Sequence, residues 1–341
     1  MINFRNDYSN IAVKEVLNRL NELEDEANIG YGEDIHTQSA KNLIRNYIGT
    51  NSDIYFLPGG TSTNMISISS FLRPHEAVIA CDSGHINVHE TGAIEGNGHK
   101  ILTVKNESGK LSPKLIKEVL DSHLDYHMVK PKLVFISNAT ELGTVYMKAE
   151  LEAISKFCHQ NDLYLYLDGA RLAVALDKSD LTLKDYARLT DAFYIGGTKI
   201  GAPLGEALII NNKKLNEDFI YLVKHFGGML AKGFVPAISF EVLFENDLYF
   251  KLGKHENDIA MALANNLKEL GVKFLSEPCT NQIFVILDNK IIEKLYDDFS
   301  FEIWSKIDDN KKAVRFVISF KSTLNDINIL TARIKELLKE E

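Results

Sequence analysis

Short apolar runs alternate with segments of helical periodicity along the first two thirds of this 341-residue chain. This alternation predicts a mostly parallel, doubly wound sheet with helices on its faces. Such a sheet binds ligands outside the carboxyl ends of its strands. The expected strands are residues 54–57, 77–80, 101–104, 133–136, 163–167, 193–195 and 207–210, and the expected helices between them include 37–48, 65–72, 112–123 and 150–161.

Three groups of functional residue types fall at the ends of these strands, which favours one shared site. They are the turn Pro58-Gly-Gly-Thr61, Asp168 and Lys199. The turn joins a strand to a helix, and a helix N-terminus with free N–H groups binds anions. Gly60 and Thr61 are therefore candidate anion ligands. The alternative is a helix that is simply capped by Thr61 or Ser62, and this stretch alone does not decide between the two. The spacing of a Walker A loop is absent.

Lys199 lies between glycines and apolar residues, in Gly196-Gly-Thr-Lys-Ile-Gly201, and 31 positions after Asp168. Poor hydration lowers the pKa of a lysine, and a neutral amine attacks carbonyl groups. Pyridoxal phosphate requires this pair, because a lysine holds its aldehyde as a Schiff base and an aspartate keeps its pyridine nitrogen protonated. A solvated lysine in a surface turn is the alternative when the stretch is taken alone. Together, Lys199 and Asp168 predict a pyridoxal phosphate enzyme.

Two histidines, His85 and His89, follow the strand 77–80 at a spacing that places them on one helix face. A metal pair is one interpretation, but no third ligand is evident nearby and no H-E-x-x-H motif is present. An exposed helix with an ordinary cap is another. A ring that stacks on a flat cofactor, with a neighbour available for proton transfer, is the third. The proximity of the other candidates favours this last interpretation for His85.

After residue 253 the pattern changes to fewer, more widely spaced strands, with a final amphipathic helix at 325–338. We therefore expect a large domain over residues 1–252 and a small α+β domain over residues 253–341. Expected strands of the small domain are 272–275, 282–287 and 314–320. Arg315 lies in the last of them and is suited to bind a carboxylate with two parallel N–H groups, although a lone arginine more often forms a surface ion pair.

Composition narrows the function classes. The net charge of −9 argues against a nucleic-acid surface. Three widely spaced cysteines, with no C-x-x-C pair, are typical of reduced thiols in the cytoplasm rather than of a disulfide framework or a zinc site. No apolar run reaches membrane-spanning length, and the first residues lack the apolar core of a signal peptide. We expect a cytoplasmic protein that binds a small molecule, with no metal, no nucleic-acid partner and no membrane contact.

The motifs together resemble the threonine aldolase/aromatic β-eliminating lyase family of fold-type-I pyridoxal phosphate enzymes. They occur in the family's order from near residue 2 to near residue 335, and their combination is specific although the glycine turn alone is not. The resemblance implies a seven-stranded, mostly parallel sheet and a smaller C-terminal domain. The motifs are Phe4-Arg-Asn-Asp7, Tyr31-Gly-Glu-Asp34, Pro58-Gly-Gly-Thr61, Ser83-Gly-His-Ile86, Leu167-Asp-Gly-Ala-Arg171 and Gly197-Thr-Lys199.

The resemblance also implies roles for individual residues. Lys199 forms the Schiff base, Asp168 pairs with the pyridine nitrogen, and Arg171 lies near the ring hydroxyl. His85 stacks on the ring, while Gly60 and Thr61, with help from Thr198, hold the phosphate. Arg315 matches the arginine that binds the substrate carboxylate. Tyr31 enters the site of a neighbouring subunit, because such enzymes are homodimers or homotetramers with shared sites.

Several positions depart from the family pattern. Asn138-Ala-Thr140 stands where many threonine aldolases have Asn-Thr-His, so a histidine associated with the substrate hydroxyl is absent. Asn6 lies in Arg5-Asn-Asp-Tyr8 where Arg-Ser-Asp-Thr is frequent, and His89 replaces a common tyrosine. Leu230 replaces an arginine, with Lys232 two places on. In the family these positions contact substrate rather than cofactor, so Asn6, Thr140 and Lys232 become candidate substrate contacts.

The predicted reaction is retro-aldol cleavage of a β-hydroxy-α-amino acid of the L-threonine or L-allo-threonine type to glycine and an aldehyde. Lys199 is the nucleophile, and the base is His85, His89 or a bound water. The alternative on the same scaffold is β-elimination, racemisation or transamination, which the missing histidine makes a real competitor. A non-catalytic amino-acid or cofactor-binding protein is disfavoured because binding alone requires neither Asp168 nor Lys199, and a nucleotide-binding protein is disfavoured because its glycine motifs are missing.

Overall fold

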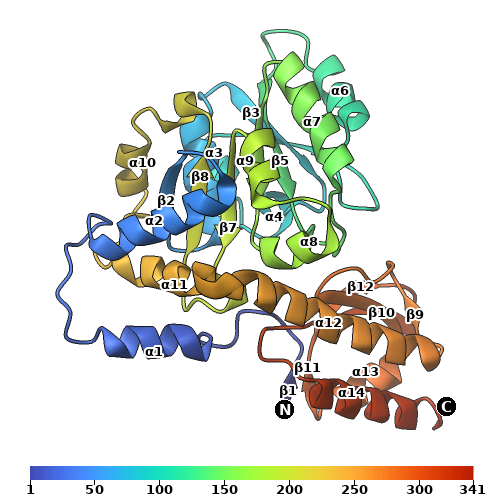
Figure 1. Ribbon diagram of the computed structural model, residues 1–341. Coiled ribbons are helices and arrows are strands. Elements are labelled where there is room, and N and C mark those ends of the chain that lie inside the picture. The colour runs from blue at the N-terminus through green and yellow to red at the C-terminus, as the bar shows by residue number, and fades with distance from the viewer. Residues whose placement is uncertain (341) are drawn as a thin grey trace.

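A computed structural model describes residues 1–340 of the chain. Its larger part, the upper part of Figure 1, is a seven-stranded sheet with helices on both faces. The strands follow the spatial order β2-β8-β7-β6-β5-β3-β4, and β8 alone runs antiparallel to both of its neighbours. The predicted mostly parallel, seven-stranded sheet is therefore confirmed. The strands are β2 (Asp53–Leu57), β3 (Glu76–Cys81), β4 (Ile101–Val104), β5 (Lys130–Ser137), β6 (Tyr164–Asp168), β7 (Ala192–Gly196) and β8 (Glu206–Ile210).

Alternate residues of these strands enter two separate hydrophobic cores, one on each face of the sheet. In β3, for example, Val78 packs in one core and Ile79 in the other. A strand that is buried on both faces appears in the sequence as a continuous apolar run, which is why the strands of this sheet could be predicted. The helices of this part are α2 (Ile35–Ile48), α3 (Gly60–Phe71), α4 (His85–Val88), α5 (Ala93–Gly96), α6 (Pro113–Asp121), α7 (Lys148–Gln160), α8 (Leu172–Lys178), α9 (Leu183–Leu189), α10 (Phe219–His225) and α11 (Phe234–Phe244), with short 3₁₀ turns at η1 (Thr198–Ile200), η2 (Lys213–Asn216) and η3 (Glu245–Asp247).

Local sequence explains how several of these helices begin and end. Asp34 caps α2 by accepting a hydrogen bond from the Thr37 amide, and Gly49 ends it in the left-handed conformation. Ser112 caps α6 directly before Pro113, a residue that is favoured at the first helical position. By contrast, no side chain caps α3, whose first residue is Gly60. The alternative of a cap by Thr61 or Ser62 is therefore not realised, and the start of α3 keeps N–H groups that have no acceptor within the described residues.

The C-terminal part contains a four-stranded antiparallel sheet in the order β12-β13-β10-β9. Its core is separate from those of the large sheet. Strand β12, helix α13 and the short pair that β1 forms with β11 are missing from the sequence prediction. The elements are β9 (Lys273–Phe274), β10 (Gln282–Asp288), α13 (Asn289–Leu295), β11 (Phe299–Ser300), β12 (Glu302–Lys306), β13 (Lys311–Val317) and α14 (Leu324–Leu337).

Helix α12 (Leu248–Glu269) connects the two parts and runs along the lower edge of the large one (Figure 1). Residue 253, where the sequence divides the chain, lies inside this helix. The N-terminal segment, with β1 (Ile2–Asn3) and α1 (Lys14–Glu22), crosses to the other part, because Phe4 packs in the core of the C-terminal sheet. The domain limits at 252 and 253 remain a prediction.

Candidate active site

A cavity of about 320 Å³ opens where β5, β6 and β7 end. The turn after β2, the start of α4 and the η1 turn complete its walls. Of the residues predicted from the sequence, it is lined by Gly60, Thr61, His85, His89, Asp168, Arg171, Thr198 and Lys199, and it is also lined by Tyr8, Glu141, Tyr194 and Glu206. The expected cofactor ligands therefore lie around one cavity, although they come from segments far apart in the chain.

Asp168 is the last residue of β6, and only 4% of it is exposed. Three donors hold its carboxylate: the Tyr194 hydroxyl and the Ala170 amide donate to Oδ1 over 2.5 and 2.9 Å, and Asn64 Nδ2 donates to Oδ2 over 2.9 Å. Burial, and then the Asp168 charge, raise the pKa of Tyr194, so its phenol stays protonated and remains a donor. A buried carboxylate fixed in this way is suited to pair with a protonated ring nitrogen.

Lys199 lies in η1, directly after β7, and β7 is the neighbour of the strand that ends in Asp168. Its ammonium has no hydrogen bond or ion pair within residues 1–340. Burial, and then the Arg171 guanidinium, lower the pKa of this lysine. The carboxylates of Asp7, Asp168 and Glu206 oppose that effect. The amine is therefore uncharged more readily than that of an ordinary lysine, which is the state that attacks an aldehyde.

Gly169 shows why the motif after Asp168 contains a glycine. A Cβ on Gly169 would lie 1.9 Å from the carbonyl oxygen of Tyr194, on the neighbouring strand β7. Because the Gly196 amide donates to the Gly169 carbonyl over 2.9 Å, this contact is where β6 and β7 are joined beyond their paired residues. Only glycine permits so close an approach. The glycine thereby sets the distance between the strand that ends in Asp168 and the strand that leads to Lys199.

The start of α3 fits a phosphate group. The amides of Gly60, Thr61 and Ser62 have no acceptor within the described residues, since the first helical bond runs from Thr63 to Gly59. The hydroxyls of Ser62 and Thr63 donate to the Gly59 carbonyl. The Thr61 hydroxyl has no such bond within the described residues, and Thr61 lines the cavity. Across the cavity, Thr198 Oγ1 accepts from the Gly205 amide over 3.1 Å. Free N–H groups at a twelve-residue helix are a natural anion site.

His85 is tied to Asp168 through two buried side chains. Its Nδ1 lies 2.8 Å from Glu90 Oε1, Asn64 donates to that same oxygen over 2.8 Å, and Asn64 also donates to Asp168. Burial raises the pKa of Glu90 in spite of its partners. His89 follows at the end of the single turn α4, with its ring 5.5 Å from that of His85. Burial, and then the neighbouring His85 and Arg315, lower the pKa of His89, which favours its neutral form.

The structure places the candidate substrate residues in different surroundings. Thr140 points into its own turn, where its hydroxyl bonds Thr144 over 2.8 Å, and the next residue, Glu141, faces the cavity instead. Asn6 accepts from the Tyr8 amide and the Ser9 hydroxyl and does not line the cavity.

Tyr31 and Lys232 lie outside this cavity. Tyr31 is half exposed, has a left-handed backbone with φ of 62°, and stacks under the Lys224 ammonium at 4.4 Å. Lys232 is exposed. Both residues are on the surface, so neither contributes to the cavity of its own chain.

Arg171 and Arg315 are both held by carboxylates. Arg171, which is expected beside the cofactor ring, donates through Nε and Nη2 to Asp7 over 2.7 and 3.0 Å. Part of its guanidinium is therefore already bound to a residue of the N-terminal segment. Arg315 contacts Glu302 and donates to Gln282 over 3.1 Å. Gln282 in turn donates to the Thr140 carbonyl over 3.3 Å. The small sheet is thereby attached to the loop that follows β5.

Sequence reasoning missed four residues that line the cavity, namely Tyr8, Glu141, Tyr194 and Glu206, and two that hold lining residues by hydrogen bonds, Asn64 and Glu90. Glu206 is buried, accepts from the Gly197 amide over 2.8 Å, and has its pKa raised to about 7 by burial. Glu141 is buried beside His85, whose amide donates to it over 3.2 Å, and burial raises its pKa. For Glu206 the one available signal was a charged residue placed directly before an apolar run, in Gly205-Glu-Ala-Leu208.

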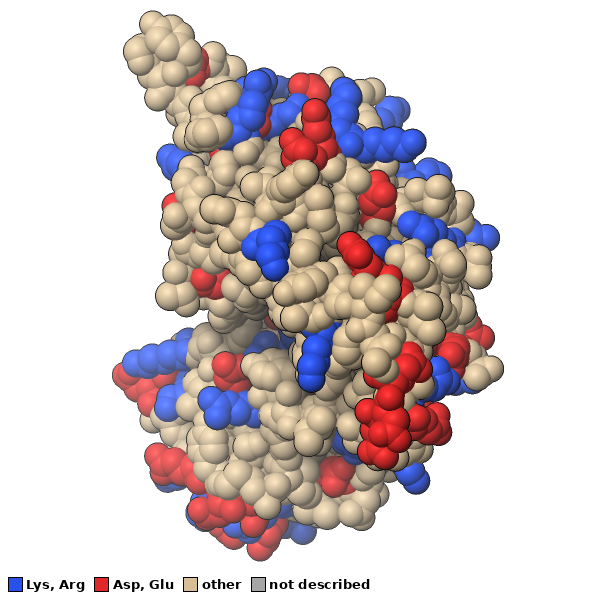
Figure 2. Space-filling model, turned by 90° about the vertical axis from the view of Figure 1, so that its left-hand side faces the viewer, with Lys and Arg blue, Asp and Glu red and all other residues tan. Residues whose placement is uncertain are grey.

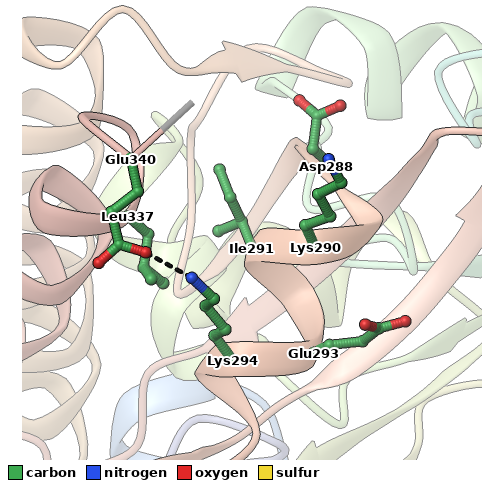
Figure 3. A pocket seen from close by; sticks show the side chains of 7 residues that line it. All are labelled: Asp288, Lys290, Ile291, Glu293, Lys294, Leu337 and Glu340. Atoms are coloured by element: carbon green, nitrogen blue, oxygen red, sulfur yellow. Dashed lines mark hydrogen bonds and ion pairs between the residues drawn. The ribbon is translucent and has the colours of Figure 1, made fainter.

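Figure 3 shows a second cavity, of about 460 Å³, between α13 and the end of α14. It contains the ion pair of Lys294 with Glu340 and is lined by charged side chains, most of them exposed, and by Ile291 and Leu337. Although larger, it is lined mainly by exposed side chains, and its strand-end carboxylate, Asp288, pairs with Lys311 over 3.5 Å. Within residues 1–340 no group of three histidine, cysteine or acidic side chains is placed to hold a metal ion, and no helix is both long and apolar enough to cross a membrane.

The fold is that of the fold-type-I pyridoxal phosphate enzymes, and solved structures at lower identity share it. One is a putative aromatic amino acid beta-eliminating lyase/threonine aldolase from Exiguobacterium sp. 255-15, with a TM-score of 0.77, 19% identity and coverage of 98% and 97% of the two chains. Within this class the chain belongs to the beta-eliminating lyase family, which it matches over residues 4–290.

Three relatives are informative. A threonine aldolase from Leishmania major has a solved structure with a TM-score of 0.98, 43% identity and 99% coverage of both chains. A low-specificity L-threonine aldolase from Pseudomonas sp. (strain NCIMB 10558) is 34% identical over 273 residues, which are 78% of either chain. An alanine racemase, TOXG of Cochliobolus carbonum, is 31% identical over 255 residues, covering 70% of this chain and 64% of that protein.

Proposed function

We propose that the chain is a pyridoxal-phosphate-dependent aldolase that cleaves a β-hydroxy-α-amino acid, such as L-threonine or L-allo-threonine, to glycine and an aldehyde. The observation that carries the proposal is that one cavity is lined by both Lys199 and Asp168. The Lys199 amine has no hydrogen bond or ion pair within residues 1–340, and the Asp168 carboxylate accepts three hydrogen bonds. Named threonine aldolases among the relatives support the substrate class.

The residues of the cavity fit the cofactor. Lys199 would bind its aldehyde, Asp168 its ring nitrogen, and the amides of Gly60 and Thr61 its phosphate, while His85 would cover its ring. When bound, the cofactor supplies an electron sink that takes up the charge left when the Cα–Cβ bond breaks. The polypeptide's share of the work is to fix the groups around that bond and to move protons.

Cleavage requires that the proton of the β-hydroxyl be removed as the Cα–Cβ bond breaks. Two imidazole rings adjoin the cavity. Because His85 Nδ1 is bonded to Glu90, its other nitrogen is the one left for a substrate. His89 is favoured in its neutral form, which can accept a proton. We propose that one of these rings, directly or through a water, is the base, and that Arg315 binds the substrate carboxylate.

Product analysis tests the proposal. The protein loaded with pyridoxal phosphate is incubated separately with L-threonine and L-allo-threonine, and glycine and acetaldehyde are quantified. Both products are expected in equal amounts, and Lys199→Ala is expected to lose both the products and the Schiff-base absorbance. A cofactor spectrum without acetaldehyde would reject the aldolase, and an unchanged Lys199→Ala protein would reject the site.

Racemisation is the second candidate, because one relative is named an alanine racemase. The same preparation is incubated with L-alanine, and the D-enantiomer is measured by chiral chromatography. Accumulation of D-alanine with no acetaldehyde from threonine would favour this candidate. The aldolase proposal instead expects acetaldehyde release to exceed any inversion at Cα by at least about tenfold.

We further propose a homodimer or homotetramer in the cytoplasm. Figure 2 shows a broad central area with few charged side chains on the face that carries α2, α10 and the loop before α2. Exposed apolar residues of these segments are Ile29, Tyr31, Ile35, Ile220 and Tyr221. An apolar area of this kind is typical of a surface covered by another subunit. The three free cysteines, two of them buried, fit a reducing compartment.

A further inference from the structure

Arg315 lies in a niche built by three strands of the small sheet. It is in β13, and its register partners are Glu302 on β12 and Phe284 on β10. Its side chain is 13% exposed. The ring of Trp304 lies beside the guanidinium, with 5.0 Å between its centroid and Cζ. A guanidinium stacked on an aromatic ring keeps its N–H edges available for planar, bidentate binding.

The donors of Arg315 are only partly used. Nη1 donates to Gln282 Oε1 over 3.1 Å, and Nη2 contacts Glu302 Oε2. Nε is buried and has no hydrogen-bond partner within the described residues. A carboxylate binds arginine best through two parallel N–H groups, such as Nε and Nη2. Glu302 takes one group of that edge and leaves the other unsatisfied, which costs free energy in a buried position.

We propose that Glu302 occupies, in the free protein, the place on Arg315 that the carboxylate of the amino-acid substrate takes, and that it thereby sets the affinity for that carboxylate. The inference rests on the proposed function, in which Arg315 binds the substrate carboxylate. A substrate displaces Glu302 from Nη2 and also satisfies the free Nε. Glu302 is thus an internal competitor for the substrate.

The surroundings of Glu302 allow it to leave. Its side chain is 42% exposed, and β12 is an edge strand of the small sheet. The carboxylate has no bond other than the one to Arg315 within the described residues. Once displaced, it can be hydrated without moving the backbone. The incoming carboxylate gains two charge-assisted bonds while the protein gives up one.

A row of rings connects this niche to the cavity. The Trp304 ring lies 6.4 Å from that of His89, which lies 5.5 Å from that of His85. The charges of Arg315, Glu302 and Lys199 all act on His89. A substrate carboxylate on Arg315 would therefore replace the charge of Glu302 near His89.

Trp304 makes the displacement measurable, because it is the one tryptophan in the sequence. The holoenzyme is titrated with 3-hydroxybutyrate, which is threonine without its amino group, while tryptophan emission is followed. Emission is expected to change as Arg315 exchanges partners, and Arg315→Lys is expected to weaken the response. In Glu302→Gln the dissociation constant for 3-hydroxybutyrate should fall about three- to tenfold. 1-Amino-2-propanol, which lacks the carboxylate, should bind both proteins equally.

Steady-state kinetics give an independent readout. Glu302→Gln should lower the KM for L-threonine by the same factor and leave kcat within about twofold. Glu293→Gln, which removes one exposed charge from α13, serves as the matched control and should change neither constant. An unchanged or higher dissociation constant in Glu302→Gln would overturn the inference, since Glu302 would then be a residue that positions Arg315. Absence of acetaldehyde would overturn the proposed function alone, because the emission titration does not depend on cleavage.

Discussion

At the scale of single residues, Lys199 is controlled by charges that lie far from it in the sequence or on the next strand. Burial and Arg171 favour its neutral form, and Asp7, Asp168 and Glu206 favour its ammonium form. Glu206 has a pKa raised to about 7, so its own charge appears near neutral pH. The reactivity of the amine is therefore linked to the ionisation of a carboxyl group on β8.

We expect Glu206→Gln to lower the pKa of Lys199 further, because one of the charges that stabilise the ammonium is removed. The rate at which pyridoxal phosphate binds covalently to cofactor-free protein depends on the neutral amine. Measured by absorbance across a range of pH, the midpoint of this rate should therefore move to lower pH than in the wild type. Glu217→Gln, at an exposed position, should leave the midpoint unchanged. A midpoint that stays in place in Glu206→Gln contradicts the linkage.

At the scale of elements, His36 joins three segments around α2. Its Nδ1 lies 2.7 Å from Glu241 Oε2 on α11, and its Nε2 lies 2.9 Å from Glu26 Oε1 in the loop after α1. Burial alone would lower the pKa of His36, but the two carboxylates outweigh burial and raise it. A raised pKa in the folded state stabilises the protein below the ordinary histidine pKa of about 6.5, and this contribution is lost as the pH rises through the raised value.

Replacing His36 by Gln should therefore lower the melting temperature more at about pH 6 than at about pH 9. The expected difference between the two losses is on the order of 2 °C. Thermal unfolding of both proteins at several pH values measures it, with the exposed His75→Gln as control. A loss that is equal at all pH values would show that the ring acts by packing and not by its charge.

The elements also show what can be predicted from a sequence like this one. The strands of the large sheet are buried on both faces, so each appears as an apolar run, and their ends gave the positions of Asp168 and Lys199. Strand β12 was missed because it is an edge strand with mostly exposed side chains and no apolar run. Glu302 and Trp304, which belong to it, could not be related to Arg315 for the same reason.

The rest of the site depends on contacts that have no local signature. Asn64 looks like an ordinary residue of an apolar helix, yet it bonds both Glu90 and Asp168. Thr140 was chosen because of a motif, but the turn directs its hydroxyl to Thr144 and presents Glu141 to the cavity. Which side chain of a loop faces a cavity is decided by the loop's own hydrogen bonds, and these are not encoded in residue spacing.

At the scale of the whole molecule, a buried polar cluster joins the N-terminal segment to both sheets. Asp7 pairs with Arg171, and Asn281 donates to Asp7 over 3.1 Å and to Glu256 over 2.9 Å. Asp7 and Arg171 are separated by 164 residues. Burial would raise the pKa of Asp7, but Arg171 and Lys199 hold it below its usual value. The stability from this pair is present above the ordinary aspartate pKa and is lost as the pH falls through the lowered one.

Asp7→Asn should destabilise the protein by about 3–5 kcal/mol, because it leaves the buried Arg171 charge without a partner. Urea unfolding at neutral pH measures this loss, and Asp297→Asn, at an exposed position, should cost less than about 0.5 kcal/mol. The loss should shrink as the pH is lowered, since the wild-type carboxyl is then protonated too. A loss below about 1 kcal/mol at neutral pH would show that Arg171 finds another partner.

Helix α12 approaches α8 closely at Gly253. A Cβ on its Gly253 would lie 2.4 Å from the carbonyl oxygen of Ala173 in α8, so the two backbones touch there. Beyond that point the helix extends by roughly 24 Å, at 1.5 Å per residue, toward the small sheet. Each degree of tilt about the contact displaces the far end by roughly 0.4 Å. Because Gly253 and Ala173 set how closely α12 approaches α8, these two small residues help to fix the distance between Arg315 in the small sheet and Lys199 in the cavity, although neither lines that cavity.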